Sequence, residues 1–264
     1  MLVHARLGAQ VLQAQTHFGG SIFYRSPLSL GDAAPARGGV PVLFPQFAEL
    51  GPLPKHGFAR TSQWELTQES RSGAKHNIQY TLDLRPDQQA SWPHGARLEM
   101  HAQLAPNVLC LRLMVTNIGD TLFSWTGGLH PYFAVEDLEA CSVAGLSGLR
   151  VKDRYDASVV LEPEEPVRWG RQPLERLYDA APALTLRTGR QQLELSTTGF
   201  DQWMVWNPGE AGGNALADLP DGDWRRFVCI EPVRVDRPVE LAPGATFTGS
   251  LQVRTIPAED ARLT

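Results

Sequence analysis

The sequence predicts an all-β protein, a large antiparallel β-sandwich with few short helices. Short runs in which apolar and polar residues alternate recur along the 264 residues, as at Leu109, Leu111, Leu113 and Val115, and this alternation is typical of half-buried strands. Asn, Gly, Asp and Pro separate the runs, and no stretch keeps a helical period beyond a couple of turns. Many short strands without long helices favour antiparallel sheets packed face to face.

The expected strands follow one another along the whole chain. In order, they lie within residues 19–26, 76–86, 96–119, 121–135, 141–148, 183–188, 191–198, 203–208, 226–233 and 245–256. The best candidate for a short helix is Pro173 to Ala180, and the Gly- and Asp-rich stretch from Gly209 to Trp224 is expected to be a surface loop. No low-complexity linker or abrupt charge shift divides the chain, so a single domain over residues 1–264 is expected.

The composition is that of an ordinary globular protein and excludes several classes. Hydrophobic residues make up 42% and charged residues 20%, and the net charge is −5. An acidic chain is a poor general binder of nucleic acid or membrane surfaces. No apolar run approaches the ~20 residues that a membrane helix needs, and the first residues lack the pattern of a secretion signal. The expected location is therefore the cytoplasm.

Motifs for metal, nucleotide and serine chemistry are missing from the sequence. Cys110, Cys141 and Cys229 are widely spaced and form no CxxC pair, so neither a structural zinc site nor a disulfide framework is expected. HxH and HExxH arrangements are also absent, which argues against a metal site. Without a GxSxG elbow, a P-loop or a GxGxxG fingerprint, a serine hydrolase, an NTPase and a nicotinamide enzyme lose support.

The segment "RGGVPVLFPQFAELGPLPKHGFAR", Arg37 to Arg60, carries basic side chains on a stretch stiffened by prolines. Two arginines on a stiff loop lose little entropy when they hold an anion, and the planar guanidinium suits phosphate or carboxylate. The alternative is that Arg37 and Arg60 pair with acids elsewhere in the fold. Composition alone favours that alternative, because such ion pairs are common and often contribute little.

Two further residues are candidates for acid/base chemistry. His130 lies in "GGLHPYFAV" and can act as an acid or a base near neutral pH; the alternative is a core histidine bonded to backbone. Glu231 lies in "RFVCIEPV" within an apolar strand pattern, where burial would raise its pKa as a general base requires. The alternative for Glu231 is a buried ion pair with an arginine.

Taken in order, these segments resemble the aldose 1-epimerase superfamily, and most closely its hexose-6-phosphate mutarotase (glucose-6-phosphate 1-epimerase) branch. The matching segments are "RGGVPVLFPQF", "LPKHGFAR", "GGLHPYFAV", "WNP" and "FVCIEPV", with a weaker match at "LERLYDA". They extend from Arg37 to Pro232 and so cover most of the chain. The resemblance implies the galactose mutarotase-like supersandwich, which agrees with the strand pattern.

The resemblance also implies a reaction, the interconversion of the two anomers of a cyclic sugar. The C1 hydroxyl loses its proton, the ring oxygen gains one, the ring opens, and it closes again on the other face. Glu231 matches the general base and His130 the general acid, and no metal or organic cofactor is implied. His56 matches a histidine that hydrogen-bonds the sugar near the reacting oxygens.

Further matches concern the rest of a sugar phosphate, the implied small-molecule partner. Arg37 and Arg60 match the positions that hold the 6-phosphate, and Lys55 matches a polar contact to substrate. Two expected substrate contacts depart from the branch pattern: Gln46 replaces an aromatic or aliphatic residue, and Glu175 replaces an aspartate. Val233, after the catalytic carboxylate, replaces a glycine.

Two alternatives stay open at this point. The same chemistry could serve an unphosphorylated aldose, with the arginines in structural roles, or the sandwich could bind carbohydrate without catalysis. The presence of both His130 and Glu231 argues against the second, because sugar binding alone does not need a matched acid and base. No nucleic-acid or membrane partner is expected, and the chain is expected to be a monomer.

Overall fold

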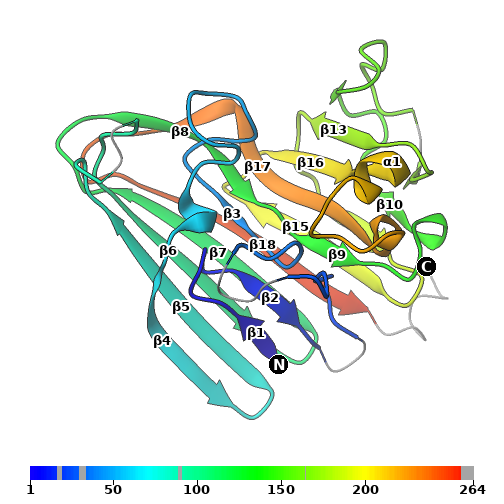
Figure 1. Cartoon of the computed structure of the whole chain (residues 1–264), viewed down its shortest axis with the longest axis horizontal. Helices are drawn as coiled ribbons and strands as arrows, with labels where there is room; N and C mark the ends of the chain where they lie inside the picture. The colour runs from blue at the N-terminus through cyan, green and yellow to red at the C-terminus, as the bar shows by residue number, and fades with distance from the viewer. Residues whose placement is uncertain (17–19, 30–33, 89–90, 164, 257–264) are drawn as a thin grey trace.

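The computed structural model describes residues 1–264 apart from 17–19, 30–33, 89–90, 164 and 257–264. Strands dominate this part of the chain, and the named strands pair antiparallel throughout. Within it they form a nine-stranded, a seven-stranded and a two-stranded sheet (Figure 1). The prediction of an all-β, antiparallel fold is confirmed.

The nine-stranded sheet has the order β12-β10-β14-β15-β18-β7-β6-β5-β4. Its strands are β4 (Glu65–Ser72), β5 (Lys75–Leu84), β6 (Ala96–Leu104), β7 (Val108–Asn117), β10 (Ser142–Ala144), β12 (Val167–Arg168), β14 (Leu184–Arg187), β15 (Gln192–Thr198) and β18 (Thr246–Ile256). In β7, Leu109, Leu111, Leu113 and Val115 are all fully buried. The alternation in the sequence therefore marks the inner face of this sheet.

The seven-stranded sheet has the order β11-β13-β16-β17-β8-β3, with β9 also paired to β17. Its strands are β3 (Val42–Leu43), β8 (Phe123–Leu129), β9 (Tyr132–Ala134), β11 (Val151–Asp153), β13 (Leu174–Tyr178), β16 (Gln202–Asn207) and β17 (Phe227–Leu241). The remaining elements are β1 (Leu2–His4), β2 (Val11–Ala14), helix α1 (Gly209–Asn214) and 3₁₀ turns at Ala59–Thr61, Leu138–Ala140 and Asp223–Arg226. In the described part of the chain, no helix is long and apolar enough to cross a membrane.

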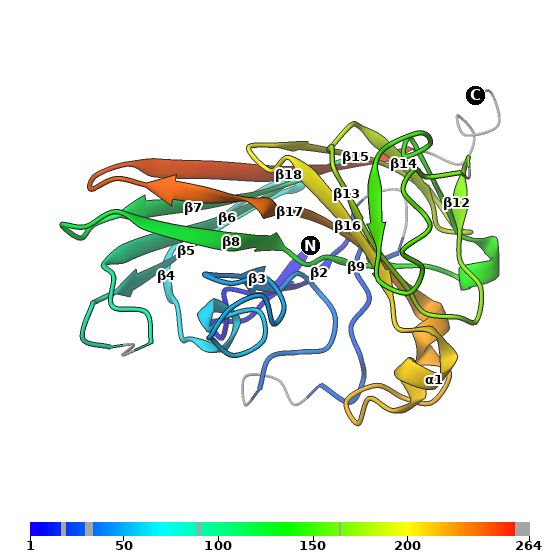
Figure 2. The same cartoon turned by 90° about the horizontal axis from the view of Figure 1, so that it is seen from above.

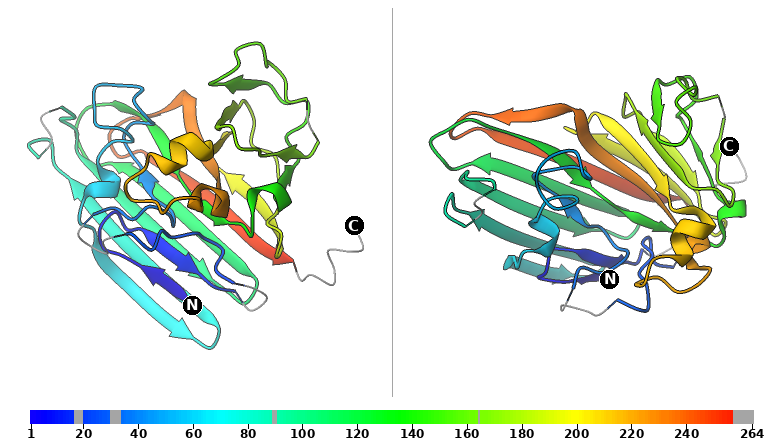
Figure 3. Two further views of the ribbon diagram at one scale, coloured as in Figure 1. Left: turned by 45° about the vertical axis from the view of Figure 1, so that its right-hand side comes forward. Right: turned by 45° about the horizontal axis from the view of Figure 1, so that its top comes forward.

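The main core joins the inner faces of the two large sheets. One cluster of buried side chains includes Leu111 of β7, Trp125 of β8 and Ile230 of β17, and Figure 3 shows β18 in red beside β17 in orange. From Phe227 to Val233 every residue of β17 is buried, so this strand is covered on both faces. Side chains that alternate with Ile230 therefore face a second buried environment, and that environment contains the pocket described below.

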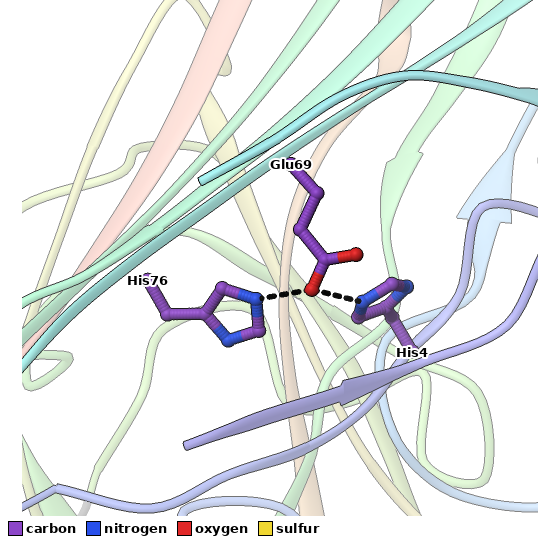
Figure 4. Close-up of side chains that lie close together, drawn as sticks. All are labelled: His4, Glu69 and His76. Carbon is purple, nitrogen blue, oxygen red and sulfur yellow. Dashed lines mark hydrogen bonds and ion pairs between the residues drawn. The ribbon is translucent and has the colours of Figure 1, made fainter. Parts of the chain in front are cut away.

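The N-terminal strand β1 is tied to the β4–β5 hairpin by a polar cluster (Figure 4). The Oε1 atom of Glu69 lies 2.9 Å from His76 Nε2 and 3.8 Å from His4 Nε2. The Nδ1 atom of His76 accepts a hydrogen bond of 3.2 Å from the backbone N–H of Leu2, and Nδ1 of His4 lies 2.6 Å from the hydroxyl of Tyr80. The cluster thus holds residues from three strands together.

The predicted helix from Pro173 to Ala180 is wrong. Leu174–Tyr178 forms strand β13, which pairs with β11 on one side and β16 on the other. Backbone hydrogen bonds from two neighbouring strands override the weak local preference of a short segment, because propensity is only a small contribution per residue. The position matters for the site, since this strand carries Glu175.

Two other local expectations also change. The Gly209 to Trp224 stretch contains α1 and begins a 3₁₀ turn, and the side chain of Trp224 is buried. A Cβ atom on Gly213 would lie 2.4 Å from Trp224, so the absent side chain lets the indole pack against α1. The expected strand at 19–26 forms only isolated bridges at Ser21, Phe23 and Arg25, and its first residue, 19, lies outside the described residues.

Candidate active site

A pocket of about 310 Å³ lies on the face of the seven-stranded sheet that points away from the main core. Met204 of β16 and Glu231 of β17 are register partners and line it, whereas their strand neighbours Val205 and Ile230 belong to the core. The segment from Arg37 to Arg60 and the loop after α1 supply further walls. Figure 2 shows the N-terminal loops, in blue and cyan, and α1, in gold, on one side of β8 and β9.

Glu231 is a carboxylic acid buried at the base of this pocket, only 1% exposed. Burial raises the pKa of its carboxyl well above the ordinary value, Glu175 adds to this effect, and Lys55 opposes it. Among the described residues its Oε2 atom has no hydrogen-bond partner, and its Oε1 atom lies 3.4 Å from Nε2 of His130 rather than beside an arginine. The described structure therefore does not show the buried ion pair with an arginine that was the alternative for Glu231.

His130 lies between β8 and β9 and is 7% exposed. Its Nε2 atom is 3.4 Å from Oε1 of Glu231, and its ring stacks on Tyr132 with centroids 4.8 Å apart and planes at 8°. Its backbone N–H donates to the Pro41 carbonyl at 3.0 Å, but within the described chain the ring Nδ1 atom has no partner. Burial lowers the pKa of the imidazole well below its ordinary value, and His56 and the nearby arginines lower it further.

The two glycines before Leu129 allow the strands around His130 to approach closely. Gly127 and Gly128 have φ of 144° and 153°. A Cβ atom on Gly127 would lie 2.0 Å from the Leu43 carbonyl oxygen, and one on Gly128 would lie 2.2 Å from that of Pro232. The glycine pair therefore permits β8 to sit between β3 and β17, which brings His130 to Glu231 across 101 residues of sequence (231 minus 130).

His56 lies beside His130, with ring centroids 5.6 Å apart. Its φ of 65° is left-handed, and two bonds hold this turn: its backbone N–H donates to the Ala48 carbonyl at 2.9 Å, and its Nδ1 accepts from the Ala48 N–H at 3.2 Å. Burial, followed by Arg60 and Lys55, lowers the pKa of His56 to about 3. His56 is thus a neutral ring whose proton is on Nε2, a hydrogen-bond donor at neutral pH.

Arg37 and Arg60 both line the pocket. Arg37 donates from Nε to both carboxylate oxygens of Asp218, at 3.1 and 3.2 Å, and from Nη1 to the Tyr132 hydroxyl at 3.1 Å. Arg60 donates a long 3.4 Å bond from Nη2 to the Lys55 carbonyl, and its buried Nε has no partner in the described chain. Arg37 is therefore partly neutralised, whereas Arg60 retains free donors.

Lys55 and Glu175 also line the pocket, each with a partner of opposite charge. The Nζ atom of Lys55 lies 3.0 Å from Glu49, and both side chains are exposed. Arg154 donates to Glu175 at 3.0 Å. Lys55 can exchange Glu49 for a ligand at modest cost, because an exposed ion pair contributes little free energy. The side chain of Glu175 is only 20% exposed, whereas its partner Arg154 is exposed.

Gln46 is the one proposed substrate contact that the structure does not bring to the pocket. Its side chain is 3% exposed and stays within its own loop. Its amide nitrogen donates to the carbonyls of Ala48 and Leu53 at 3.0 and 3.1 Å, and its oxygen accepts from the Leu53 N–H at 2.9 Å. Gln46 thus cross-links the wall that carries Lys55 and His56, a role that the sequence did not reveal.

Comparison with known protein families agrees with this arrangement. The model of the aldose 1-epimerase family matches residues 5–254. The chain belongs to the aldose 1-epimerase family. This epimerase is therefore an isomerase whose substrates are small-molecule sugars.

Individual relatives and solved structures are also similar to this chain. A protein from Cenchrus ciliaris, provisionally named glucose-6-phosphate 1-epimerase, is 26% identical over 95% of this chain and 80% of its own length. One of the same provisional name from Escherichia coli is 30% identical over 74% of this chain and 66% of its own. A provisionally named mutarotase from Salmonella typhimurium shares the fold, with a TM-score of 0.87 at 22% identity over 97% of this chain and 87% of that one. A galactose 1-epimerase from Lactobacillus acidophilus gives a TM-score of 0.72 at 14% identity over 95% and 89%. The supersandwich prediction is confirmed.

Three residues at the epimerase pocket carried no usable signal in the sequence. Asp218 lies in the Gly- and Asp-rich stretch that was expected to be surface loop, and Arg154 follows the short strand β11 without any motif. Tyr132 stood in the quoted "GGLHPYFAV" segment, but nothing marked its hydroxyl as the partner of Arg37. All three depend on contacts between distant segments, which spacing in one sequence does not report.

Proposed function

We propose that the chain interconverts the α and β anomers of a hexose 6-phosphate, such as glucose 6-phosphate, without a cofactor. The observation that carries this proposal is the 3.4 Å approach of His130 Nε2 to Glu231 Oε1 in a pocket whose wall presents Arg37 and Arg60. The provisional names of the relatives from Cenchrus ciliaris and Escherichia coli support the phosphosugar.

The acid/base pair fits the proton balance of ring opening. One proton leaves the C1 hydroxyl and one arrives at the ring oxygen, so the pair must begin with one proton and end with one. Glu231 accepts from the hydroxyl and His130 donates to the ring oxygen, so the pair's proton lies on His130 when the ring opens, although burial by itself favours it on Glu231. The two residues exchange roles when the ring closes. Since the two groups are buried and in contact, they titrate as a coupled pair. Each positioned transfer accelerates the reaction by about 10²–10⁴-fold.

His56 would hold the sugar while this proton transfer takes place. Its Nε2–H is a donor whose tautomer is set by the bond from the Ala48 N–H to Nδ1. Because its pKa lies at about 3, it donates without competing with His130 for the catalytic proton. A fixed donor beside the acid orients the ring oxygens, which is the main contribution of positioning groups.

The phosphate would occupy the arginine end of the pocket. Within the described chain Arg60 has an unpaired Nε, and Arg37 has donors beyond those used by Asp218 and Tyr132. Two guanidinium groups form short, charge-assisted bonds to phosphate oxygens. The bonds inside the Arg37–Arg60 segment, including those of Gln46, keep this end rigid while C1 reacts.

One observation favours an unphosphorylated aldose as the second candidate. The carboxylate of Asp218 takes the Nε side of Arg37, and a phosphate placed there would meet a like charge. In that case Asp218 and Arg37 would instead bind sugar hydroxyls. The chemistry at His130 and Glu231 would be unchanged.

Anomer exchange measured by NMR, with the spontaneous rate subtracted, separates the two candidates. We expect a higher kcat/KM for glucose 6-phosphate than for glucose. A charged hydrogen bond contributes about 1.5–3 kcal/mol, so Arg37→Ala and Arg60→Ala should each lower kcat/KM for the phosphosugar by roughly 10- to 150-fold and affect glucose far less. Arg171→Ala, which removes an exposed pair with Glu210 outside the pocket, is the control. Equal losses on both sugars would refute the phosphate site.

Three coarser expectations belong to the same proposal. We infer a single domain over residues 1–264, a monomer, and a cytoplasmic location. Light scattering coupled to size-exclusion chromatography tests the oligomeric state, since the monomer requires a mass that does not change with concentration.

A further inference from the structure

Behind the catalytic pair lies a third side chain with a metal-binding atom, that of Cys229. Strand β17 carries Cys229 and Glu231 two residues apart, so both side chains point to the same face of the sheet. Each of Cys229, His130 and Glu231 offers one ligand atom, and these atoms lie within 4.8 Å of one another. All three side chains are buried, and Cys229 is a free thiol.

The spacing of these atoms suits a tetrahedral divalent ion with sulfur and nitrogen ligands. Bonds of about 2.1 Å at a tetrahedral centre place neighbouring ligand atoms roughly 3.4 Å apart, and His130 Nε2 and Glu231 Oε1 are 3.4 Å apart. Thiolate, imidazole and carboxylate are all ligands of Zn²⁺. Two anionic ligands would also neutralise the ion, which removes the cost of burying an uncompensated charge.

Buried polar atoms without a partner are the independent indication of a binding site. In the described chain, Oε2 of Glu231 and Nδ1 of His130 are buried without a partner. If Nδ1 holds the ring proton, Nε2 is free to coordinate. His130 and Glu231 line the pocket, so an ion can reach them from solvent and keep its fourth position open toward the cavity.

The His4–Glu69–His76 cluster in Figure 4 differs because its ring nitrogens already have partners, although its possible ligand atoms are similarly close. Nδ1 of His76 accepts from the Leu2 N–H, and its Nε2 lies 2.9 Å from Glu69 Oε1 and 3.2 Å from Nε of Arg71. Both ring nitrogens of His76 are therefore engaged, and a cation there would meet the Arg71 guanidinium, so the cluster is a structural tie.

We propose that Cys229, His130 and Glu231 form an inhibitory site for a thiophilic divalent cation such as Zn²⁺. When the ion binds, the thiol proton of Cys229 and the one proton shared by His130 and Glu231 pass to solvent, and the sulfur, nitrogen and carboxylate lone pairs bind the metal. Those lone pairs on His130 and Glu231 are the ones that ring opening needs under the proposed function. The ion and the sugar therefore compete, and the sequence could not predict this because the ligands have no metal-motif spacing.

Cobalt binding and zinc inhibition together test the site. Titration of the whole chain with Co²⁺ should give a near-ultraviolet thiolate-to-cobalt absorption band that Cys229→Ser abolishes. Cys229→Ser should keep the epimerase rate of wild type and need at least ~10-fold more Zn²⁺ for inhibition. Losing only a residue that hydrogen-bonds a metal ligand already lowers metal affinity by about that factor, and here a ligand itself is lost. Zn²⁺ should raise KM for the sugar and leave kcat unchanged.

The other cysteines provide matched controls. Cys141→Ser and Cys110→Ser should retain both the cobalt band and the zinc sensitivity. The inference fails if the wild-type chain shows no thiolate band, if Cys229→Ser keeps it, or if Zn²⁺ inhibits Cys229→Ser and wild type equally. A cobalt band without measurable epimerase activity would uphold the metal site and refute the proposed function, so the two failures can be told apart.

Discussion

Glu231→Gln should lower activity and raise stability at the same time. The carboxyl is buried, its Oε2 has no partner among the described residues, and its Oε1 lies 3.4 Å from Nε2 of His130. An amide keeps the shape of the side chain, and its nitrogen can donate to His130 Nε2. It carries no charge, so it cannot take the sugar proton and does not incur the cost of a buried carboxylate.

The size of both effects follows from this environment. Loss of one general base costs about 10²–10⁴-fold in rate, which is about 2.7–5.4 kcal/mol of barrier. Burial raises the pKa of Glu231 above its unfolded value, so above pH ~4.5 the unfolded chain ionises this group more readily and wild-type stability falls as pH rises. Glu231→Gln lacks this pH-dependent loss, and we expect its free energy of unfolding at pH 7 to exceed that of wild type by about 0.5–2 kcal/mol.

Two measurements on the same preparation check the prediction. NMR exchange of the sugar anomers gives the rate, and urea unfolding at pH 7 and pH 4.5 gives the free energy of unfolding. The stability gain should shrink toward pH 4.5, where the wild-type carboxyl is protonated in the folded state. Glu240→Gln, at an exposed glutamate of the same strand, should change neither quantity. A variant with full activity, or one less stable than wild type at pH 7, would refute the role of Glu231.

Three further predictions concern the frame of the site. His56→Asn, in which asparagine fits the left-handed φ of 65°, should reduce the loss of stability at acid pH. Because the pKa of His56 in the folded chain is about 3, wild type loses up to ~1.4 kcal/mol of unfolding free energy per pH unit below pH ~6.5. An unchanged pH profile of stability in urea titrations of the variant would contradict this. Gln46→Ala should destabilise the chain by about 1–3 kcal/mol, because buried backbone groups lose their partners; a loss of sugar affinity without a loss of stability would instead mean direct contact. Gly213→Ala should lower the free energy of unfolding by about 1–3 kcal/mol, measured by thermal unfolding, because its Cβ would overlap Trp224. Gly212→Ala should leave it unchanged, because in the described chain its Cβ would meet only Pro208, at 3.4 Å.

The strand pattern was predictable because it is local. Alternation at Leu109 to Val115 specifies which face of β7 is buried whatever the strand pairs with. The segment Leu174–Tyr178 was not predictable by the same means. Its short pattern suits a helix or a strand, and only pairing with β11 and β16 selects the strand.

Candidate site residues were predictable as chemical types in unusual surroundings. A carboxylate in an apolar strand at Glu231, a histidine in a glycine-aromatic segment at His130 and arginines on a proline-rich segment each departed from its local context. What these residues face was not predictable. The amide of Gln46 turned out to serve its own loop, and the partners of Arg37 come from segments 95 and 181 residues away.

The sequence by itself determined many of the strands, through their local periodicity, and the residue types available for acid/base chemistry. The family followed from the resemblance of its ordered segments to a known pattern. Only the tertiary structure decided that His130 and Glu231 come within 3.4 Å, that Cys229 lies behind them, and that Asp218 partly neutralises Arg37. Distance, burial and charge pairing arise when sheets pack and loops cross, so they are properties of contacts between distant segments.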